Sequence, residues 1–160
     1  MHKTRIQISA DVRKKLIDLL QARLADSIDL SLAAKTAHWN VRGPDFFQLH
    51  ELFDKVHEAA DGIIDEIAER IGQLGGNAEG TPAAVAQRTK NPAYPLQIAS
   101  GPEHIAALAN TLAATANAMR LGIDEAGKLG DQGTADLLTE GVREFDKHLW
   151  FVEAHEQADK

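Results

Sequence analysis

Four long segments of the chain carry apolar residues at the three- and four-residue intervals of an amphipathic helix. We expect helices over residues 9–40, 44–74, 100–130 and 131–156. The expected apolar stripe of the first helix comprises Leu16, Leu20, Leu24 and Ile28, widened by Ile17 and Leu32. No segment shows the sustained alternation of a strand, and abundant alanine and leucine with only 5% aromatic residues also favour helix. The sequence therefore predicts an all-α fold.

Turn and cap residues separate these segments. Ser9 can cap the first helix, and Gly43-Pro44 breaks the chain after it. A connection rich in glycine, proline and alanine spans residues 75–99, where Thr81-Pro82 predicts one short extra helix. A connection of this length can cross the whole length of a bundle. We therefore expect one domain over residues 1–160, a four-helix bundle with a long crossover between its second and third helices, preceded by a short tail over residues 1–8.

Composition restricts the classes of function. The chain has 160 residues, no cysteine and a formal net charge of −7. The missing cysteines exclude disulfides and thiolate metal sites, and the acidic balance repels nucleic acid and attracts cations. The first 16 residues lack the apolar stretch of a signal peptide, and no apolar run is long enough to span a bilayer. We expect a cytoplasmic protein without a membrane partner.

Five residues form a pattern suited to metal binding. His38 lies near the end of the first expected helix, and the other four, His50, Asp54, Asp65 and Glu69, lie along the second. At about 100° per residue those four fall at roughly 0°, 40°, 60° and 100°, which is one narrow stripe on the side opposite the apolar residues. The solvated face of an ordinary amphipathic helix would give a similar pattern. The distances between the residues along the helix have to distinguish it from a metal site.

The spacing divides the pattern into two half-sites. Asp54 and Asp65 are about 16 Å apart along a helix, too far to bind one ion. The midpoint of residues 50 and 69 is also the midpoint of residues 54 and 65, between Ala59 and Ala60. A second copy crossing antiparallel about a two-fold axis there would place His50 opposite Glu69 and Asp54 opposite Asp65, building two complete sites. Such a mixture of imidazole and carboxylate suits iron, manganese or zinc.

These residues also carry a family resemblance. The run AKTAHWNVRGPDFFQLHELFD, followed by DEIAERIGQLGG and FDKHLWFVEA, resembles the Dps family of mini-ferritins over nearly the whole chain. The family pattern His-x11-His-x3-Asp-x10-Asp-x3-Glu is met in full. The resemblance implies a ferritin-like fold and a ferroxidase site with His38, His50 and Asp54 from one subunit and Asp65 and Glu69 from its two-fold mate. It further implies a homododecameric shell that oxidises Fe²⁺ to Fe³⁺, preferentially with hydrogen peroxide, and stores the ferric mineral.

The absence of a Glu-x-x-His motif agrees with a metal site that lies between subunits rather than inside one bundle. Di-iron sites inside a single helical bundle use Glu-x-x-His motifs that project into the bundle's own core. No glutamate in this chain has a histidine three residues later. We therefore expect no site of that kind here.

Several other residues match positions that the resemblance marks. Trp39 corresponds to a tryptophan near the family's site, where it could quench a radical or simply pack at the interface. Glu51, Glu58 and Asp61 are candidates for mineral nucleation, although Lys55 places a positive charge beside them and a plain solvated face is an equal alternative. Candidates for the family's acidic pores are Asp131, Asp136 and Glu140, which the dipole of the fourth helix would also favour.

The remaining histidines match no spacing typical of a metal or catalytic site. We expect surface or packing roles for the following five: His2, His57, His104, His148 and His155.

DNA binding divides the resembling family, whose DNA-binding members often carry a flexible basic tail. Here Lys3 and Arg5 are the candidate DNA-tail residues, and the C-terminal sequence EQADK adds little positive charge. Against the net charge of −7 we expect weak binding at physiological salt. The alternative to an iron oxidase and store is a structural protein that condenses the nucleoid, with iron handling secondary. An inert helical adaptor is a third possibility.

Overall fold

The computed structural model describes residues 1–157, and the last three residues, including the end of the EQADK sequence, lie outside the described part. The helices are α1 (Ala10–Asn40), α2 (Phe46–Gln73), α3 (Pro82–Arg88), α4 (Gly101–Lys128) and α5 (Gln132–Glu153). Within residues 1–157 the only β pairing is one isolated bridge between Arg42 and Ser100. The all-α prediction is confirmed.

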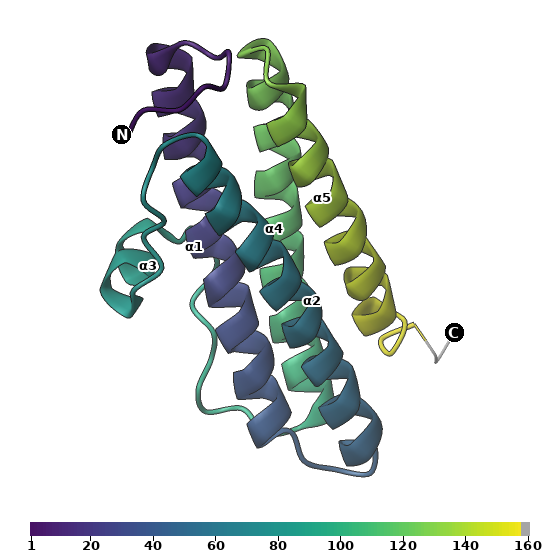
Figure 1. The fold of residues 1–160 in the computed structure, drawn as a ribbon. Helices are drawn as coiled ribbons and strands as arrows, with labels where there is room; N and C mark the ends of the chain where they lie inside the picture. Colours follow the sequence, from purple (N-terminus) through teal and green to yellow (C-terminus); the bar gives the residue numbers. More distant parts are fainter. Residues whose placement is uncertain (158–160) are drawn as a thin grey trace.

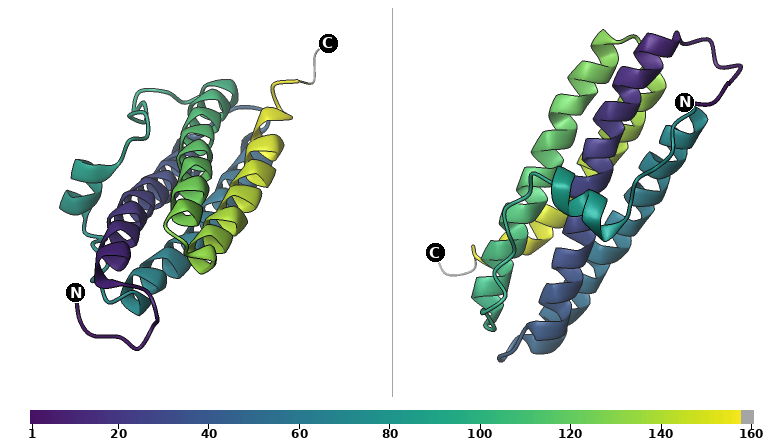
Figure 2. Two further views of the ribbon diagram at one scale, coloured as in Figure 1. Left: turned by 90° about the horizontal axis from the view of Figure 1, so that it is seen from above. Right: turned by 90° about the vertical axis from the view of Figure 1, so that its left-hand side faces the viewer.

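Four long helices form the bundle, and α3 lies outside it against α1 (Figure 1). α1 and α2 run antiparallel, as do α4 and α5, whereas α2 and α4 run in the same direction because the crossover returns the chain to the other end (Figures 1 and 2). The predicted crossover with its short helix is therefore confirmed. α5, which is the fourth of the long helices, ends at Glu153, three residues earlier than expected.

The predicted signals begin and end these helices. The Ser9 hydroxyl accepts a hydrogen bond from the Val12 backbone N–H at 3.3 Å, which caps α1. At the start of α4, the Glu103 carboxylate accepts from the Ser100 backbone N–H at 3.1 Å, one half of a capping box. After α2 and after α4 the chain turns at Gly75 and Gly130, whose φ angles of 91° and 80° are accessible to glycine at little cost.

The core fills the space among α1, α2, α4 and α5. Leu16, Leu20, Phe53, Leu112 and Phe145 are fully or almost fully buried there. Leu32 was wrongly assigned to the buried stripe of α1, because it is 55% exposed. The stripe rotates instead through Leu30, Ala34 and Ala37, since 3.6 residues per turn displace a strict four-residue repeat over several turns.

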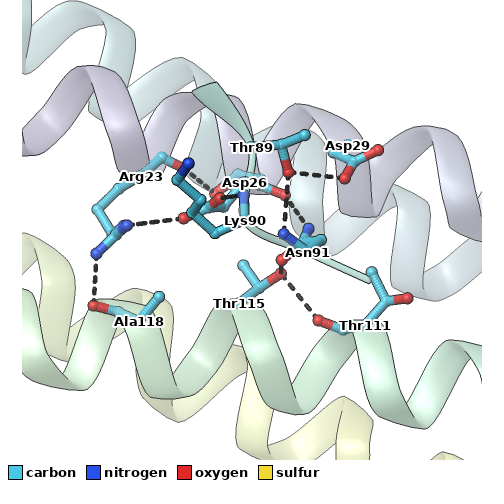
Figure 3. A network of polar contacts seen from close by, with 10 residues as sticks. Arg23, Asp26, Asp29, Thr89, Lys90, Asn91, Thr111, Thr115 and Ala118 are labelled. Atoms are coloured by element: carbon cyan, nitrogen blue, oxygen red, sulfur yellow. Dashed lines mark hydrogen bonds and ion pairs between the residues drawn. The ribbon is translucent and has the colours of Figure 1, made fainter. Parts of the chain in front are cut away.

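A polar network attaches the crossover to the bundle (Figure 3). Asp26, buried on α1, accepts from the Lys90 backbone N–H at 2.9 Å and pairs with Arg23, also at 2.9 Å. The Asn91 side chain donates to the Asp26 carbonyl at 2.8 Å, and its amide oxygen accepts from Thr115 of α4 at 3.0 Å. Because these bonds satisfy otherwise buried polar groups, they fix residues 90–91 between α1 and α4.

None of the helices within residues 1–157 combines the length and apolar character needed to cross a membrane.

Candidate metal centre

His38 and His50 interlock where the end of α1 meets the start of α2. Their rings stack with centroids 3.6 Å apart and an interplanar angle of 19°. His38 Nδ1 lies 2.7 Å from the carbonyl oxygen of His50, and His50 Nδ1 lies 2.9 Å from the carbonyl oxygen of His38. A carbonyl can only accept, so each Nδ1 carries a proton, and in the neutral imidazole each Nε2 then has the lone pair. This is the tautomer that binds a metal through Nε2.

Asp54, one turn after His50, completes the first half-site. Its Oδ1 lies 4.0 Å from His38 Nδ1 and accepts a hydrogen bond from Lys35 Nζ at 2.6 Å. The hydrogen bond from Lys35, aided by the nearby positive charge, holds the pKa of Asp54 below its ordinary value. Asp54 is therefore a carboxylate at neutral pH and can act as an anionic ligand.

Asp65 and Glu69 lie about three and four turns beyond Asp54 on α2 and are both exposed. Within residues 1–157 no group of three or more histidine, aspartate or glutamate side chains is arranged to hold a metal ion. The fold thus brings His38, His50 and Asp54 together and keeps Asp65 and Glu69 apart from them. The five-ligand assignment stays a prediction that requires a second chain.

Exposed aromatic residues stand close in sequence to the ligands of the first half-site. Trp39 is 67% exposed, and Lys35 Nζ lies 5.9 Å from its ring centroid. Phe47 is 68% exposed, while Phe46 packs against His50 with ring centroids 5.1 Å apart. Apolar side chains exposed together beside an incomplete polar site are typical of a surface that another protein covers.

Sequence reasoning missed two features of this half-site. Lys35 was not predicted to belong to the half-site because lysine is not a typical metal ligand. Its position four residues before Trp39 on the same helix does predict the contact between these two side chains. The reciprocal bonds between histidine rings and backbone carbonyls depend on how α1 and α2 meet, which side-chain patterns do not reveal.

The three nucleation candidates have different surroundings. Glu51 is exposed, and Glu58 lies 3.8 Å from Lys55, the residue expected to place a positive charge here. Asp61 faces α1, where its Oδ1 accepts from the Ser31 hydroxyl at 3.5 Å. Their role in nucleation stays a prediction.

Asp131 differs from the two other pore candidates because its carboxylate is buried, only 5% exposed. Both of its oxygens accept from Arg70 Nη2 at 2.9 Å, and Thr134 also donates to it. Although burial opposes ionisation, the hydrogen bonds from Thr134 and Arg70 lower the pKa of Asp131. Asp131 therefore joins α5 to α2 through Arg70, and its role at a pore stays a prediction.

Asp136 and Glu140 are exposed and share a surface hollow between α2 and α5 with Glu66 and Glu69. Burial, followed by the charges of Glu140 and Glu69, raises the pKa of Glu66. Arg70 also lines the hollow but is paired with Asp131, so the four glutamate and aspartate side chains give the hollow a net negative charge, which attracts cations.

The five unassigned histidines divide into three groups. His2 and His155 are exposed. His104 and His148 are buried packing residues, and burial lowers the pKa of both. His57 is half-buried, with Nδ1 lying 2.8 Å from the Ser31 hydroxyl.

The N-terminal tail is partly attached to the bundle. The His2 backbone N–H donates to the Gly75 carbonyl at 2.8 Å, beside the end of α2. The DNA-tail candidates Lys3 and Arg5 are exposed on this segment. They therefore lie on the segment that connects this attachment point to the start of α1 (Figure 1).

Comparisons with known proteins agree with this architecture. Residues 17–160 match the family model of the ferritin-like domain. The chain is 43% identical to a DNA protection during starvation protein from Agrobacterium fabrum, over 98% of this chain and 96% of that protein. The chain belongs to the Dps family.

Solved structures of Dps proteins share the fold. Dps from Mycobacterium smegmatis superposes with a TM-score of 0.91 at 35% identity, covering 97% of this chain and 93% of that one. A Dps protein from Vibrio cholerae superposes with a TM-score of 0.89 at 25% identity, covering 96% of each chain. That protein is described as a member of a broad superfamily of ferritin-like diiron-carboxylate proteins. The predicted ferritin-like class of this Dps chain is confirmed.

Proposed function

We propose that this Dps protein oxidises Fe²⁺ at sites shared between two subunits and stores the ferric product. The observation that carries the proposal is the half-site of His38, His50 and Asp54, in which two imidazoles keep Nε2 free beside an ionised carboxylate. A mixed imidazole and carboxylate set suits ferrous iron. Membership in a family with ferritin-like diiron-carboxylate relatives supports the same chemistry.

A two-fold mate would complete the half-site. Asp65 and Glu69 are exposed on α2, and the antiparallel crossing about Ala59 and Ala60 would bring them opposite the histidine pair of the partner. The exposed Trp39, Phe46 and Phe47 would be buried in the same contact. Burial would exclude bulk water and strengthen the electrostatic attraction between carboxylates and iron.

Hydrogen peroxide is the proposed oxidant because it accepts two electrons at once. Two ferrous ions each lose one electron, the O–O bond breaks, and two protons join the products as two molecules of water. The histidines and carboxylates hold both ions together, so no single-electron reduction releases a hydroxyl radical. Trp39, which follows His38 in the sequence, is the candidate to quench a stray radical or to pack at the interface.

Storage is the second part of the proposal. We infer a dodecameric shell in the cytoplasm, which would enclose the ferric mineral and protect the cell against oxidative damage. Asp136 and Glu140 are the candidates for pore entry, because their hollow attracts cations. Glu51, Glu58 and Asp61 remain the nucleation candidates. Zn²⁺ or Mn²⁺ could substitute for iron at the shared site.

A complementation experiment tests the shared site directly. His50→Ala and Asp65→Ala should each abolish fast ferrous oxidation by peroxide, measured by stopped-flow absorbance, while the shell still forms. Co-expressed in equal amounts, the two variants should regain about a quarter of the wild-type rate, because half of the pairs are mixed and each mixed pair contains one intact site.

Asp124→Ala on α4 is the matched control, since Asp124 is exposed and distant from both half-sites in sequence. It should oxidise iron at the wild-type rate. No recovery in a mixture that forms mixed shells would show that the site is not shared, and a normal rate in either single variant would refute the ligand assignment.

DNA binding is the second candidate function, favoured by relatives named as DNA protection during starvation proteins. The exposed Lys3 and Arg5 are the residues available for phosphate contacts, but each chain carries a net charge of −7. We expect retardation of DNA in a gel only at low salt and its loss in a variant lacking both basic residues. Retardation that persists at moderate salt in that variant would contradict this assignment.

A further inference from the structure

Next to the half-site lies a histidine that the proposed iron oxidation does not use. His57 is on α2, one turn after Asp54, and is half-buried against α1. Its Nδ1 lies 2.8 Å from the hydroxyl of Ser31, which is only 5% exposed. The same hydroxyl lies 3.5 Å from Oδ1 of Asp61, one turn further along α2. Ser31 therefore holds an imidazole and a carboxylate on one side of the helix.

The contact with Ser31 involves one ring nitrogen of His57. Nδ1 is the nitrogen that lies 2.8 Å from the hydroxyl, and no hydrogen bond within residues 1–157 involves Nε2. In the neutral tautomer that donates from Nδ1 to the Ser31 oxygen, Nε2 carries a lone pair that can bind a metal ion.

The position of this pair on α2 relates it to the two-fold axis, and this step rests on the proposed function. The axis passes between Ala59 and Ala60, so His57 lies about 4 Å along the helix on one side and Asp61 about 2 Å on the other. Applying the two-fold brings each His57 nearly level with the partner's Asp61. Two imidazoles and two carboxylates would then gather around the axis.

We propose that this cluster binds one divalent transition-metal cation for every two chains, at a site separate from the two shared iron sites. Two carboxylates brought together on an axis repel each other unless a cation lies between them. Two neutral imidazoles and two carboxylates supply four ligands, a set suited to Zn²⁺, Co²⁺ or Fe²⁺. The ion would join the two subunits at the centre of their contact, and Ser31 would orient both ligands.

The stoichiometry of Co²⁺ binding to the assembled protein tests the proposal. The background variant Asp65→Ala disables the shared iron sites, and its size is first confirmed by light scattering. Titrated with Co²⁺ and followed by calorimetry and visible absorption, this protein should bind one ion per two chains at the axis. That ion should disappear when His57→Asn or Asp61→Asn is added, and remain when His155→Asn, an exposed histidine elsewhere, is added.

The same count on the otherwise wild-type protein gives an independent result should the background variant fail to assemble. His57→Asn should lower the total Co²⁺ bound by one ion per two chains. The proposal would be overturned if His57→Asn left the number of bound Co²⁺ ions unchanged. It would also be overturned if His57 and Asp61 formed an ion pair with each other and bound no cobalt. If iron oxidation fails in the wild type while this ion is bound, the proposed function falls and the axial site stands.

Discussion

Asp131 and Arg70 form a buried ion pair whose removal should destabilise the end of α2 that carries Glu69. The side chain of Arg70 is 17% exposed and that of Asp131 is 6% exposed, and Arg70 also donates to Thr134 at 3.1 Å. Removing one partner of such a pair leaves the other charge buried without compensation. We therefore expect Asp131→Ala to cost about 3–5 kcal/mol of unfolding free energy. For a chain of this length the melting temperature should fall by roughly 10 °C.

The sign of the pH dependence follows from the lowered pKa of Asp131. A carboxyl whose folded pKa lies below its unfolded value stabilises the protein above the unfolded value, which is 3.8 here. This stabilisation is lost as the pH falls through the still lower folded pKa. The cost of Asp131→Ala should therefore be full at pH 7 and shrink below about pH 4.

A double-mutant cycle separates the ion pair from general packing. Arg70→Met alone should also destabilise, whereas Arg70→Met with Asp131→Ala should cost clearly less than the two single changes together, because neither charge remains buried. Asp136→Ala, an exposed aspartate one turn later on α5, should shift stability by at most about 0.5 kcal/mol. Thermal unfolding followed by circular dichroism at one protomer concentration measures all four variants. Equal melting temperatures for the Asp131 and Asp136 variants, or strict additivity in the cycle, would refute the reasoning.

Two further predictions concern titratable groups. Lys35→Met should tighten Co²⁺ binding at the His38, His50 and Asp54 half-site several-fold, because the ammonium that competes for Asp54 is gone; an unchanged or weaker affinity in a competition titration would contradict this. His104→Phe should reduce the loss of stability on acidification below pH 6.5. Burial lowers the pKa of His104 in the folded state, so the unfolded chain takes up its proton first, and one such group contributes at most about 1.4 kcal/mol per pH unit. Denaturant unfolding at pH 7 and pH 5 measures this loss. If the unfolding free energy fell by the same amount in the wild type and the variant, His104 would have no such effect.

The helices and the crossover could be predicted because their signals are local. Apolar spacing, the cap at Ser9 and the glycine turn after α2 all act within a few residues. Leu32 was misplaced because a strict four-residue repeat drifts around a helix, and it leaves the core after four turns. The ion pair of Asp131 could not be predicted for a different reason, since its partner Arg70 is 61 residues away in the sequence.

The spacing predicts which residues belong together but not how their atoms are arranged. It grouped His50, Asp54, Asp65 and Glu69 on one helix face and divided them into halves, and the fold brings His38 beside His50 and Asp54. The bonds from each imidazole to the other residue's carbonyl, and the contact between Ser31 and His57, depend on the distance between α1 and α2. Periodicity gives the direction in which a side chain leaves its helix, but the polar atom it meets depends on packing.

Lys35 explains how the incomplete half-site can exist in a single chain. Asp54 Oδ1 lies 4.0 Å from His38 Nδ1, and without a cation its charge would be poorly compensated if the proposed second chain covered it. The ammonium of Lys35, 2.6 Å from Oδ1, supplies one positive charge in that place. A divalent ion that binds Asp54 must displace this ammonium or share the carboxylate with it. Metal binding would then be weaker, but the ammonium compensates the charge of the free carboxylate, so the proposed contact between subunits would not require iron to be bound first.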